Sequence, residues 1–200
     1  IHYNFELGKD LTLQLFESSE ETDFVAFKNT LYLKLAQNFL NYRWLLTYLY
    51  GASSLAEKGF LSEEVGCVRS IRNSKHGYVN AEDVHISFSS LEQYVADIEQ
   101  AVQSGQLSAE KEFYSSVRLR GAKTSRDFLS KGISYLEFRT FDLNPYDPFA
   151  ISQETLDTVH LFLLALLWLD QLADVDNALT KADRLNNLIA LSHPHTPLPS

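Results

Sequence analysis

The residues best suited to chemistry in this sequence lie where charged and apolar side chains alternate. Tyr135, Glu137 and Arg139 are separated by Leu136 and Phe138. Successive side chains of a β-strand point to opposite faces, so this spacing predicts a strand with one charged face and one apolar face. A face that combines carboxylate, guanidinium and phenol groups suits the binding of a charged ligand.

The same division between polar and apolar positions recurs in residues 1–5, 84–88 and 111–120, where it includes His2 and His85. In the longest of these stretches the polar positions are Glu112, Tyr114, Ser116, Arg118 and Arg120, and the apolar positions are Phe113, Val117 and Leu119. Polar positions with Arg, Glu, Tyr and His but no Lys favour a concave site for charged ligands. The alternative is that each polar face meets water, as one side of an antiparallel sheet often does.

Helices are predicted where apolar residues recur every three or four positions between capping residues. The predicted helices cover residues 24–50, 90–105, 152–170 and 176–191. Gly51 would end the first helix, and Ser152 would cap the third. Ser90 and Gln93 would form a capping box at the start of the second. We expect the last two helices to pack as neighbours.

The composition is that of an ordinary globular chain. Its 200 residues are 45% hydrophobic, which is enough for one domain-sized core. The net charge of −9, without any basic run, disfavours nucleic-acid binding. The longest apolar run, residues 159–169, is far shorter than the roughly 20 residues of a membrane-spanning helix, so no membrane partner is expected. The single cysteine, Cys67, fits a reducing cytosol and is interpreted as a small structural residue.

The two ends of the sequence suggest a segment of a longer protein. The chain starts at Ile1 and contains no methionine. Three of its five prolines lie in residues 194–199, a composition typical of a loop. We therefore expect residues 193–200 to form a Pro-rich loop that leads out of the folded part.

Four groups of motifs, taken in order, resemble the glutamate–cysteine ligase family of bacteria. They are His2-Tyr-Asn-Phe5, Ser70-Ile-Arg-Asn73 with Gly77-Tyr-Val-Asn80, Glu110-Lys-Glu-Phe-Tyr114 with Val117-Arg118, and Tyr135-Leu-Glu-Phe-Arg-Thr-Phe-Asp-Leu-Asn-Pro145. Residues 38–52 most resemble the form of the family that is fused to a glutathione synthetase module in a bifunctional enzyme of Gram-positive bacteria. The resemblance covers almost the whole chain.

The resemblance implies an α+β fold similar to that of glutamine synthetase, in which an antiparallel sheet forms a funnel with helices packed on its outer face. Residues 1–192 would be part of this catalytic domain. The implied reaction is ATP-dependent: the γ-carboxylate of L-glutamate is phosphorylated, and the amine of L-cysteine then attacks the γ-glutamyl phosphate. This is the first step of glutathione biosynthesis in the cytoplasm. Mg²⁺ is the implied metal, with Mn²⁺ as a substitute. The resemblance does not decide whether the protein forms a homodimer or whether a glutathione synthetase module is fused to it.

Three of the matched residues would handle metal and phosphate. His2 matches a metal-site histidine of the family, and Glu137 matches a glutamate that binds magnesium and ATP. Arg139 matches the catalytic arginine that faces the transferred phosphoryl group, a role suited to its fixed charge and planar donors. The alternative for the last two residues is an ordinary ion pair between them.

Four further residues would bind substrate. Arg72, Tyr78 and Tyr114 match the positions that hold cysteine, where an arginine would bind its carboxylate and leave its amine free to attack. Arg118 shares the predicted polar face of Tyr114 and would contribute to phosphate or substrate binding. The alternative for the tyrosines is packing within the sheet.

The family's other acidic magnesium ligands lie upstream of the motif with which this chain begins, so we expect the chain alone to be inactive. Two other functions stay open. One is a carboxylate–amine ligase of the same fold that accepts a different amine. The other is a non-catalytic helical module that binds a partner through residues 161–169 and 24–50.

Overall fold

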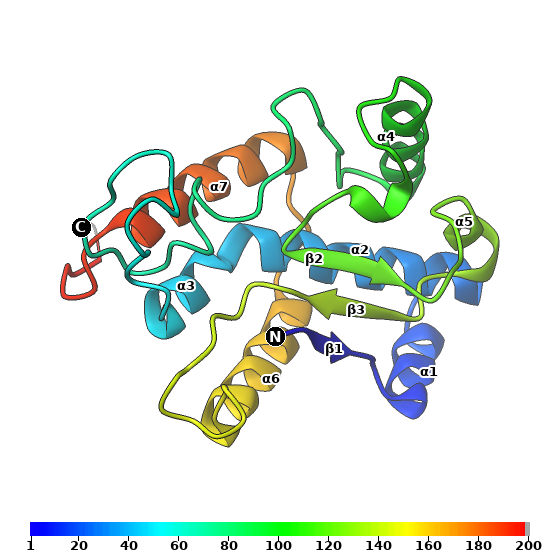
Figure 1. Cartoon of the computed structure of the whole chain (residues 1–200). Helices are drawn as coiled ribbons and strands as arrows, with labels where there is room; N and C mark the ends of the chain where they lie inside the picture. Colours follow the sequence, from blue (N-terminus) through cyan, green and yellow to red (C-terminus); the bar gives the residue numbers. More distant parts are fainter. Residues whose placement is uncertain (199–200) are drawn as a thin grey trace.

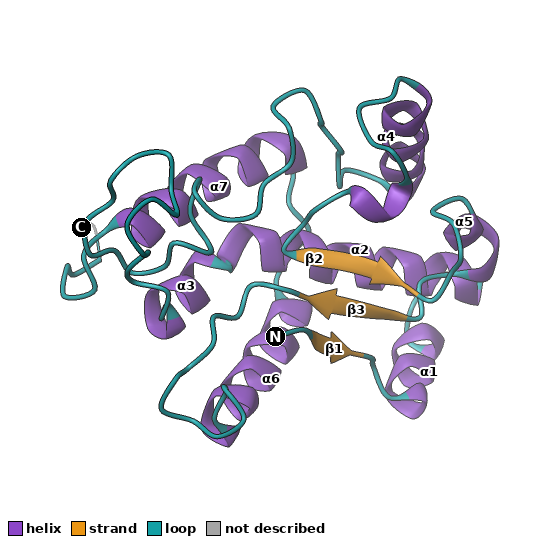
Figure 2. Cartoon of the chain, in the orientation of Figure 1, coloured by secondary structure: helices purple, strands orange, loops and turns teal. Residues whose placement is uncertain are grey.

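Three short strands form an antiparallel sheet in the computed structural model, which describes residues 1–198 (Figure 1). The strands are β1 (Tyr3–Phe5), β2 (Val117–Arg120) and β3 (Tyr135–Phe138), in the spatial order β1-β3-β2. The helices are α1 (Lys9–Glu17), α2 (Phe24–Tyr42), α3 (Trp44–Tyr50), α4 (Leu91–Gln103), α5 (Asp127–Lys131), α6 (Gln153–Trp168) and α7 (Val175–Leu191), with a 3-10 turn, η1 (Glu110–Glu112). Long loops connect these elements (Figure 2). The predicted α+β class is confirmed.

The apolar face of the sheet packs against α2, which runs behind the strands in Figure 1. Val117, Leu136 and Phe138 on this face are completely buried. The rings of Phe138 and Phe39 of α2 are 4.3 Å apart between centroids. The predicted alternation is therefore confirmed at residues 117–120 and 135–138. The strand pattern predicted from residue 111 is wrong before Val117, because residues 110–112 form a 3-10 turn and a loop follows it.

Buried amide side chains of α2 hold the surrounding loops. Asn29 donates a hydrogen bond to the carbonyl of Phe128 at 3.0 Å and accepts one from the backbone N–H of Ile133 at 2.8 Å. Gln37 donates to the carbonyl of Phe88 at 2.7 Å. Because buried backbone groups need partners, these contacts decide where each loop lies on the helix.

The predicted pairing of the last two helices is wrong. Helices α6 and α7 both pack against α2, which lies between them in Figure 1. Asn38 of α2 donates to the carbonyls of Leu166 and Asp170 at 3.1 and 3.4 Å and so anchors the end of α6. No helix within residues 1–198 is long and apolar enough to cross a membrane.

The helix predicted over residues 24–50 is divided at Arg43 into α2 and α3, and both pieces contact α7. Gly51 follows α3 but has an extended conformation, with φ −61° and ψ 124°, and not the left-handed one expected of a cap. Its lack of a side chain is required for another reason. A Cβ there would lie 2.7 Å from the carbonyl oxygen of Thr47 and 2.8 Å from that of Arg69.

The helix starts at Ser90 and Ser152 are confirmed, because each hydroxyl accepts a backbone N–H of the first turn. Gln93 does not complete the predicted capping box, since its side chain donates to Asp97 instead. The strand predicted at residues 84–88 is wrong. Val84 and Phe88 are buried as the alternation requires, but the segment is a loop without a partner strand in the described residues.

Replacing Asn29 with alanine is expected to lower the free energy of unfolding by about 1–3 kcal/mol, because the N–H of Ile133 loses its partner and the carbonyl of Phe128 keeps only its bond from the N–H of Gly132. Urea denaturation followed by circular dichroism measures this change. Thr30→Ala, at the exposed next position of the same helix, is the control and should change stability by less than about 0.5 kcal/mol. Similar losses in the two variants would contradict the role of the buried hydrogen bonds.

Candidate functional site

Glu137 occupies the centre of the polar face of the sheet and is only 5% exposed. Its Oε1 lies 2.6 Å from Nδ1 of His2. Its Oε2 lies 2.5 Å from both Nε and Nη2 of Arg120. A buried carboxylate needs such partners to offset the loss of water. The alternative of an ion pair between Glu137 and Arg139 is not observed: the partner on the neighbouring strand is Arg120.

His2 links this carboxylate to Arg139. Its Nε2 accepts a hydrogen bond from Nε of Arg139 at 3.3 Å, and its Nδ1 faces Glu137. Burial lowers the pKa of His2; the carboxylate of Glu137 raises it, and the charge of Arg139 lowers it further. A neutral imidazole with its proton on Nδ1 satisfies both contacts.

Arg139 joins the sheet to the neighbouring loops. Its backbone N–H donates to the carbonyl of Ser116 at 2.9 Å, which continues the pairing of β3 with the segment before β2. Its guanidinium carbon lies 5.2 Å from the ring centroid of Tyr114, a cation–π contact. Its carbonyl accepts Nη2 of Arg72 at 2.7 Å. Three of the predicted site residues therefore form one connected group.

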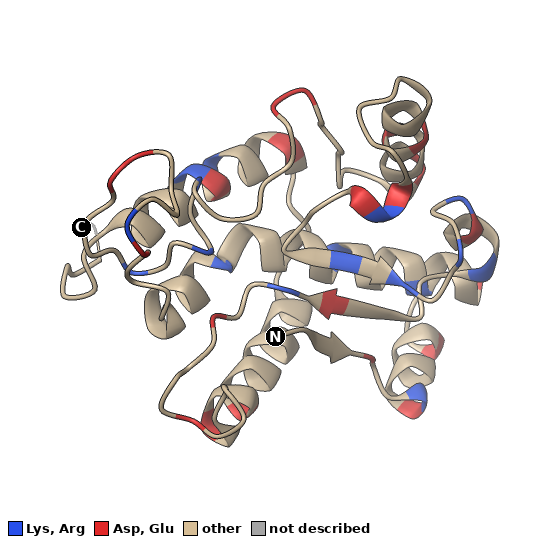
Figure 3. Ribbon diagram, viewed as in Figure 1, with Lys and Arg blue, Asp and Glu red and all other residues tan. Residues whose placement is uncertain are grey.

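Arg118 lies opposite Glu137 in the strand register, but its side chain turns to the backbone. Its Nη2 donates to the carbonyl of Phe113 at 2.6 Å and also to that of Lys111. Burial and the charges of Arg139 and Arg120 lower its pKa. The observed contacts fix the turn before β2, and the expected role in substrate binding stays a prediction. The basic strand β2 runs beside the acidic position of β3 in Figure 3.

A cleft of about 640 Å³ lies beside the charged face, between α7 and the loops that precede α4 and β2. Arg72, Tyr78 and Tyr114, the three residues predicted to hold cysteine, all line it. The rings of Tyr78 and Tyr114 are 5.0 Å apart between centroids. Within residues 1–198, Nε of Arg72 is buried and has no hydrogen-bond partner.

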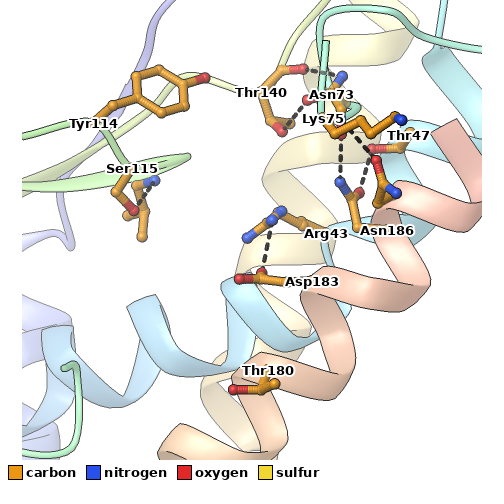
Figure 4. Close-up of polar contacts among 12 residues, drawn as sticks. Arg43, Thr47, Asn73, Lys75, Tyr114, Ser115, Thr140, Thr180, Asp183 and Asn186 are labelled. Carbon is orange, nitrogen blue, oxygen red and sulfur yellow. Dashed lines mark hydrogen bonds and ion pairs between the residues drawn. The ribbon is translucent and has the colours of Figure 1, made fainter. Parts of the chain in front are cut away.

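The opposite wall of the cleft contains polar residues that the sequence did not single out. Asn186 of α7 donates to the carbonyl of Asn73 at 2.8 Å and accepts from the hydroxyl of Thr47 at 2.8 Å. Arg43 and Asp183 form an ion pair of 2.9 Å. Figure 4 shows these pairs across the space from Tyr114 and Ser115. No sequence signal identified them, because the contacts join segments that are far apart in the chain. Arg120 could have been identified from the sequence, because the alternation places it on the same predicted polar face as Arg118.

The residues present fit part of a magnesium site. His2 and Glu137 are adjacent, but no group of three or more His, Cys, Asp and Glu in the described part of the chain could hold a metal. Mg²⁺ prefers six oxygen ligands and usually takes several from water and phosphate. Two protein donors can therefore supply only part of the coordination shell.

The chain is similar to known proteins along its whole length. The family model described as glutamate-cysteine ligase matches residues 1–106 and 103–188. The glutathione biosynthesis bifunctional protein of Streptococcus mutans is 64% identical over 200 residues, which are 100% of this chain and 26% of that protein. The chain thus spans about a quarter of the length of the curated relatives it matches.

Two solved structures share the fold. The bifunctional glutathione synthetase from Pasteurella multocida superposes with a TM-score of 0.91 at 44% identity, over 98% of this chain and 26% of that one. The glutamate–cysteine ligase from Francisella tularensis, determined in complex with AMP, gives a TM-score of 0.78 at 24% identity, over 96% of this chain and 45% of that one. The second likeness concerns the fold alone.

We expect His2 to titrate below the ordinary histidine pKa of about 6.5, because burial disfavours its charged form. Nuclear magnetic resonance of the imidazole measures the midpoint. Glu137→Gln should lower the midpoint further, and Arg139→Gln should raise it. Because the pKa of His2 is lower in the folded state than in the unfolded state, His2 contributes stability at pH values above its unfolded-state pKa. That stability is lost as the pH falls through the folded-state pKa.

The control for this titration is Arg126→Gln, which removes an exposed arginine paired with Glu99 and should leave the midpoint of His2 unchanged. A midpoint above the ordinary value, or one that rises in Glu137→Gln, would contradict a neutral imidazole held between Glu137 and Arg139.

Proposed function

The chain belongs to the glutamate–cysteine ligase family, and from this we propose that it forms part of the active site of an ATP-dependent ligase. The enzyme would join the γ-carboxylate of L-glutamate to the amine of L-cysteine through a γ-glutamyl phosphate, the first step of glutathione biosynthesis. The whole reaction would take place in the cytoplasm.

The proposal rests on one observation: Arg139 connects the charged face of the sheet to the adjacent cleft. Its side chain contacts His2 on the sheet and Tyr114 at the cleft, and its carbonyl accepts Arg72. A ligase that transfers a phosphoryl group and then admits an amine needs two such regions next to each other, because the acyl phosphate formed in one must meet the nucleophile held in the other.

On the charged face, Arg139 would stabilise the negative charge of the transferred phosphoryl group. His2 orients the guanidinium through its neutral Nε2, and Glu137 fixes the other nitrogen of His2. His2 and Glu137 would hold Mg²⁺, or Mn²⁺, together with ligands outside this pair, and their present contacts with Arg139, with Arg120 and with each other would then be exchanged for the metal. When bound, the metal offsets the repulsion between the ATP phosphates and the glutamate carboxylate.

At the cleft, the guanidinium of Arg72 would bind the carboxylate of L-cysteine. Tyr78 and Tyr114 stand together at the same cleft and would flank the substrate. The amine would then stay free of ion pairs and point to the acyl phosphate. Arg118, which is bound to backbone carbonyls, would act by holding the segment that carries Tyr114.

We infer that residues 1–192 are part of a catalytic domain that is completed by other segments, and that a glutathione synthetase module is fused to it. The names of two relatives support the second point, because they call those proteins a glutathione biosynthesis bifunctional protein and a bifunctional glutathione synthetase. Residues 193–200 would lead out of this part. In the structure Arg69 holds the start of this stretch through the carbonyls of His193 and Thr196 at 3.3 and 2.7 Å. Residues 199 and 200 lie outside the described residues.

Arg139→Ala and Glu137→Gln, introduced into the full-length protein, are expected to lower turnover by about 100-fold or more, because each removes charge that acts in the transition state. Cysteine-dependent release of phosphate from ATP measures turnover, and thermal unfolding checks that the variants fold. Arg126→Ala, a surface arginine away from the site, is the control and should keep full activity. Wild-type turnover in both site variants would contradict the proposed roles of Arg139 and Glu137.

The chain of residues 1–200 alone is expected to release no phosphate when ATP, L-glutamate, L-cysteine and Mg²⁺ are supplied together. The reason is the incomplete metal site, for which the described residues provide two adjacent donors and no cluster of three. The same assay on the full-length protein is the positive control. Clear activity of the chain by itself would contradict the need for ligands from elsewhere.

A further inference from the structure

The carboxylate of Asp142 lies where the exit of β3 meets two other loops. A single oxygen, Oδ2, accepts four hydrogen bonds: from the backbone N–H groups of Ala52 and Ser53 at 2.8 and 3.0 Å, and from the hydroxyls of Ser53 and Ser70 at 2.9 and 2.7 Å. An ionised oxygen suits so many donors better than a neutral carbonyl does, because charge strengthens each bond. Asp142 therefore organises this junction.

The two serines extend the network to Arg72. Each serine uses its only proton to bind Asp142, and its lone pairs stay available to accept. Ser53 Oγ accepts the backbone N–H of Arg72 at 3.0 Å. Ser70 Oγ accepts the backbone N–H and the side-chain Nδ2 of Asn73 at 3.2 and 3.0 Å. Four polar side chains and one turn thus form a continuous hydrogen-bonded unit.

The other side of the same turn is attached to β3. Arg72 donates to the carbonyl of Arg139, and Asn73 exchanges two hydrogen bonds of 2.9 Å with Thr140. Figure 4 shows the pairing of Asn73 with Thr140. The turn is consequently held from both sides, by the backbone of Arg139 and Thr140 just after β3 and by the carboxylate of Asp142, three residues after Arg139.

We propose that Asp142 is a positioning residue for the acceptor substrate, which sets Arg72 at a fixed place relative to Arg139. This rests on the proposed function, in which Arg72 binds the carboxylate of L-cysteine. The geometry of the network supports it: Ser53, which is bound to Asp142, accepts the backbone N–H of Arg72, and the side chain of Arg72 is bound to the carbonyl of Arg139. Arg72 is thus fixed through both its backbone and its side chain.

A purely structural role predicts something different. A network that only holds the loops together would affect stability and all substrates alike. A positioning role acts through Arg72, so it should affect the binding of cysteine and depend on the presence of Arg72. The two roles can therefore be separated by kinetics and by a double-mutant cycle.

The test uses Asp142→Asn in the full-length protein, with Asp142→Ala as a second variant. Asparagine keeps the size of the side chain but removes the charge. We expect the KM for L-cysteine to rise by about tenfold or more, while the KM values for ATP and L-glutamate change by less than about twofold. In an Arg72→Ala background, Asp142→Asn should have almost no further effect on the KM for L-cysteine. The control is Asp147→Asn, since Asp147 binds only the backbone N–H of Phe149 in an exposed loop.

Hydrogen exchange of the Arg72 and Asn73 amides supplies a readout that is independent of activity, and Asp142→Asn should speed both. Additive effects of the Asp142 and Arg72 substitutions, equal changes in all three KM values, or unchanged exchange would overturn the inference. If the wild-type protein has no cysteine-dependent activity while exchange responds as expected, the proposed function fails and the positioning of Arg72 stands.

Discussion

Burial of α2 on almost all sides is the constraint on which the rest of the structure depends. The helix contacts the sheet and each of the other α-helices. Its apolar residues form the centre of the core, and its buried amides, among them Asn29, Gln37 and Asn38, take up backbone groups of loops that would otherwise be buried without partners. Each loop therefore has one place on the helix where its polar groups are satisfied.

The chemistry of the polar face follows from this arrangement. Because α2 covers one face of β2 and β3, the charged side chains of both strands must share the other face. On that face the charged side chains contact one another and are partly shielded from water. A carboxylate such as Glu137 is stable there only when cations or N–H donors surround it. Arg120 and His2 provide these contacts, and the resulting group is held in one geometry before any ligand arrives.

The cleft and the charged face are held in place by different interactions. The charged face is fixed by strand pairing, whereas Arg72 is carried by a loop that depends on side-chain hydrogen bonds. Arg139 belongs to both regions, since its guanidinium lies over Tyr114 and its carbonyl receives Arg72. Residues separated by long stretches of sequence are thereby brought together, and hydrogen bonds to Asp142 connect the loop of Arg72 to the segment that follows β3.

The sequence by itself determined what depends on nearby residues: the alternation of β2 and β3, the helix starts at Ser90 and Ser152, and the set of polar residues from which the site is built. It could not determine which groups pair. The partner of Glu137, the division of the first long helix at Arg43 and the loop at residues 84–88 were decided only by tertiary structure. The physical reason is that periodicity is imposed by the local backbone, while strand pairing and ion pairing require partners from distant parts of the chain.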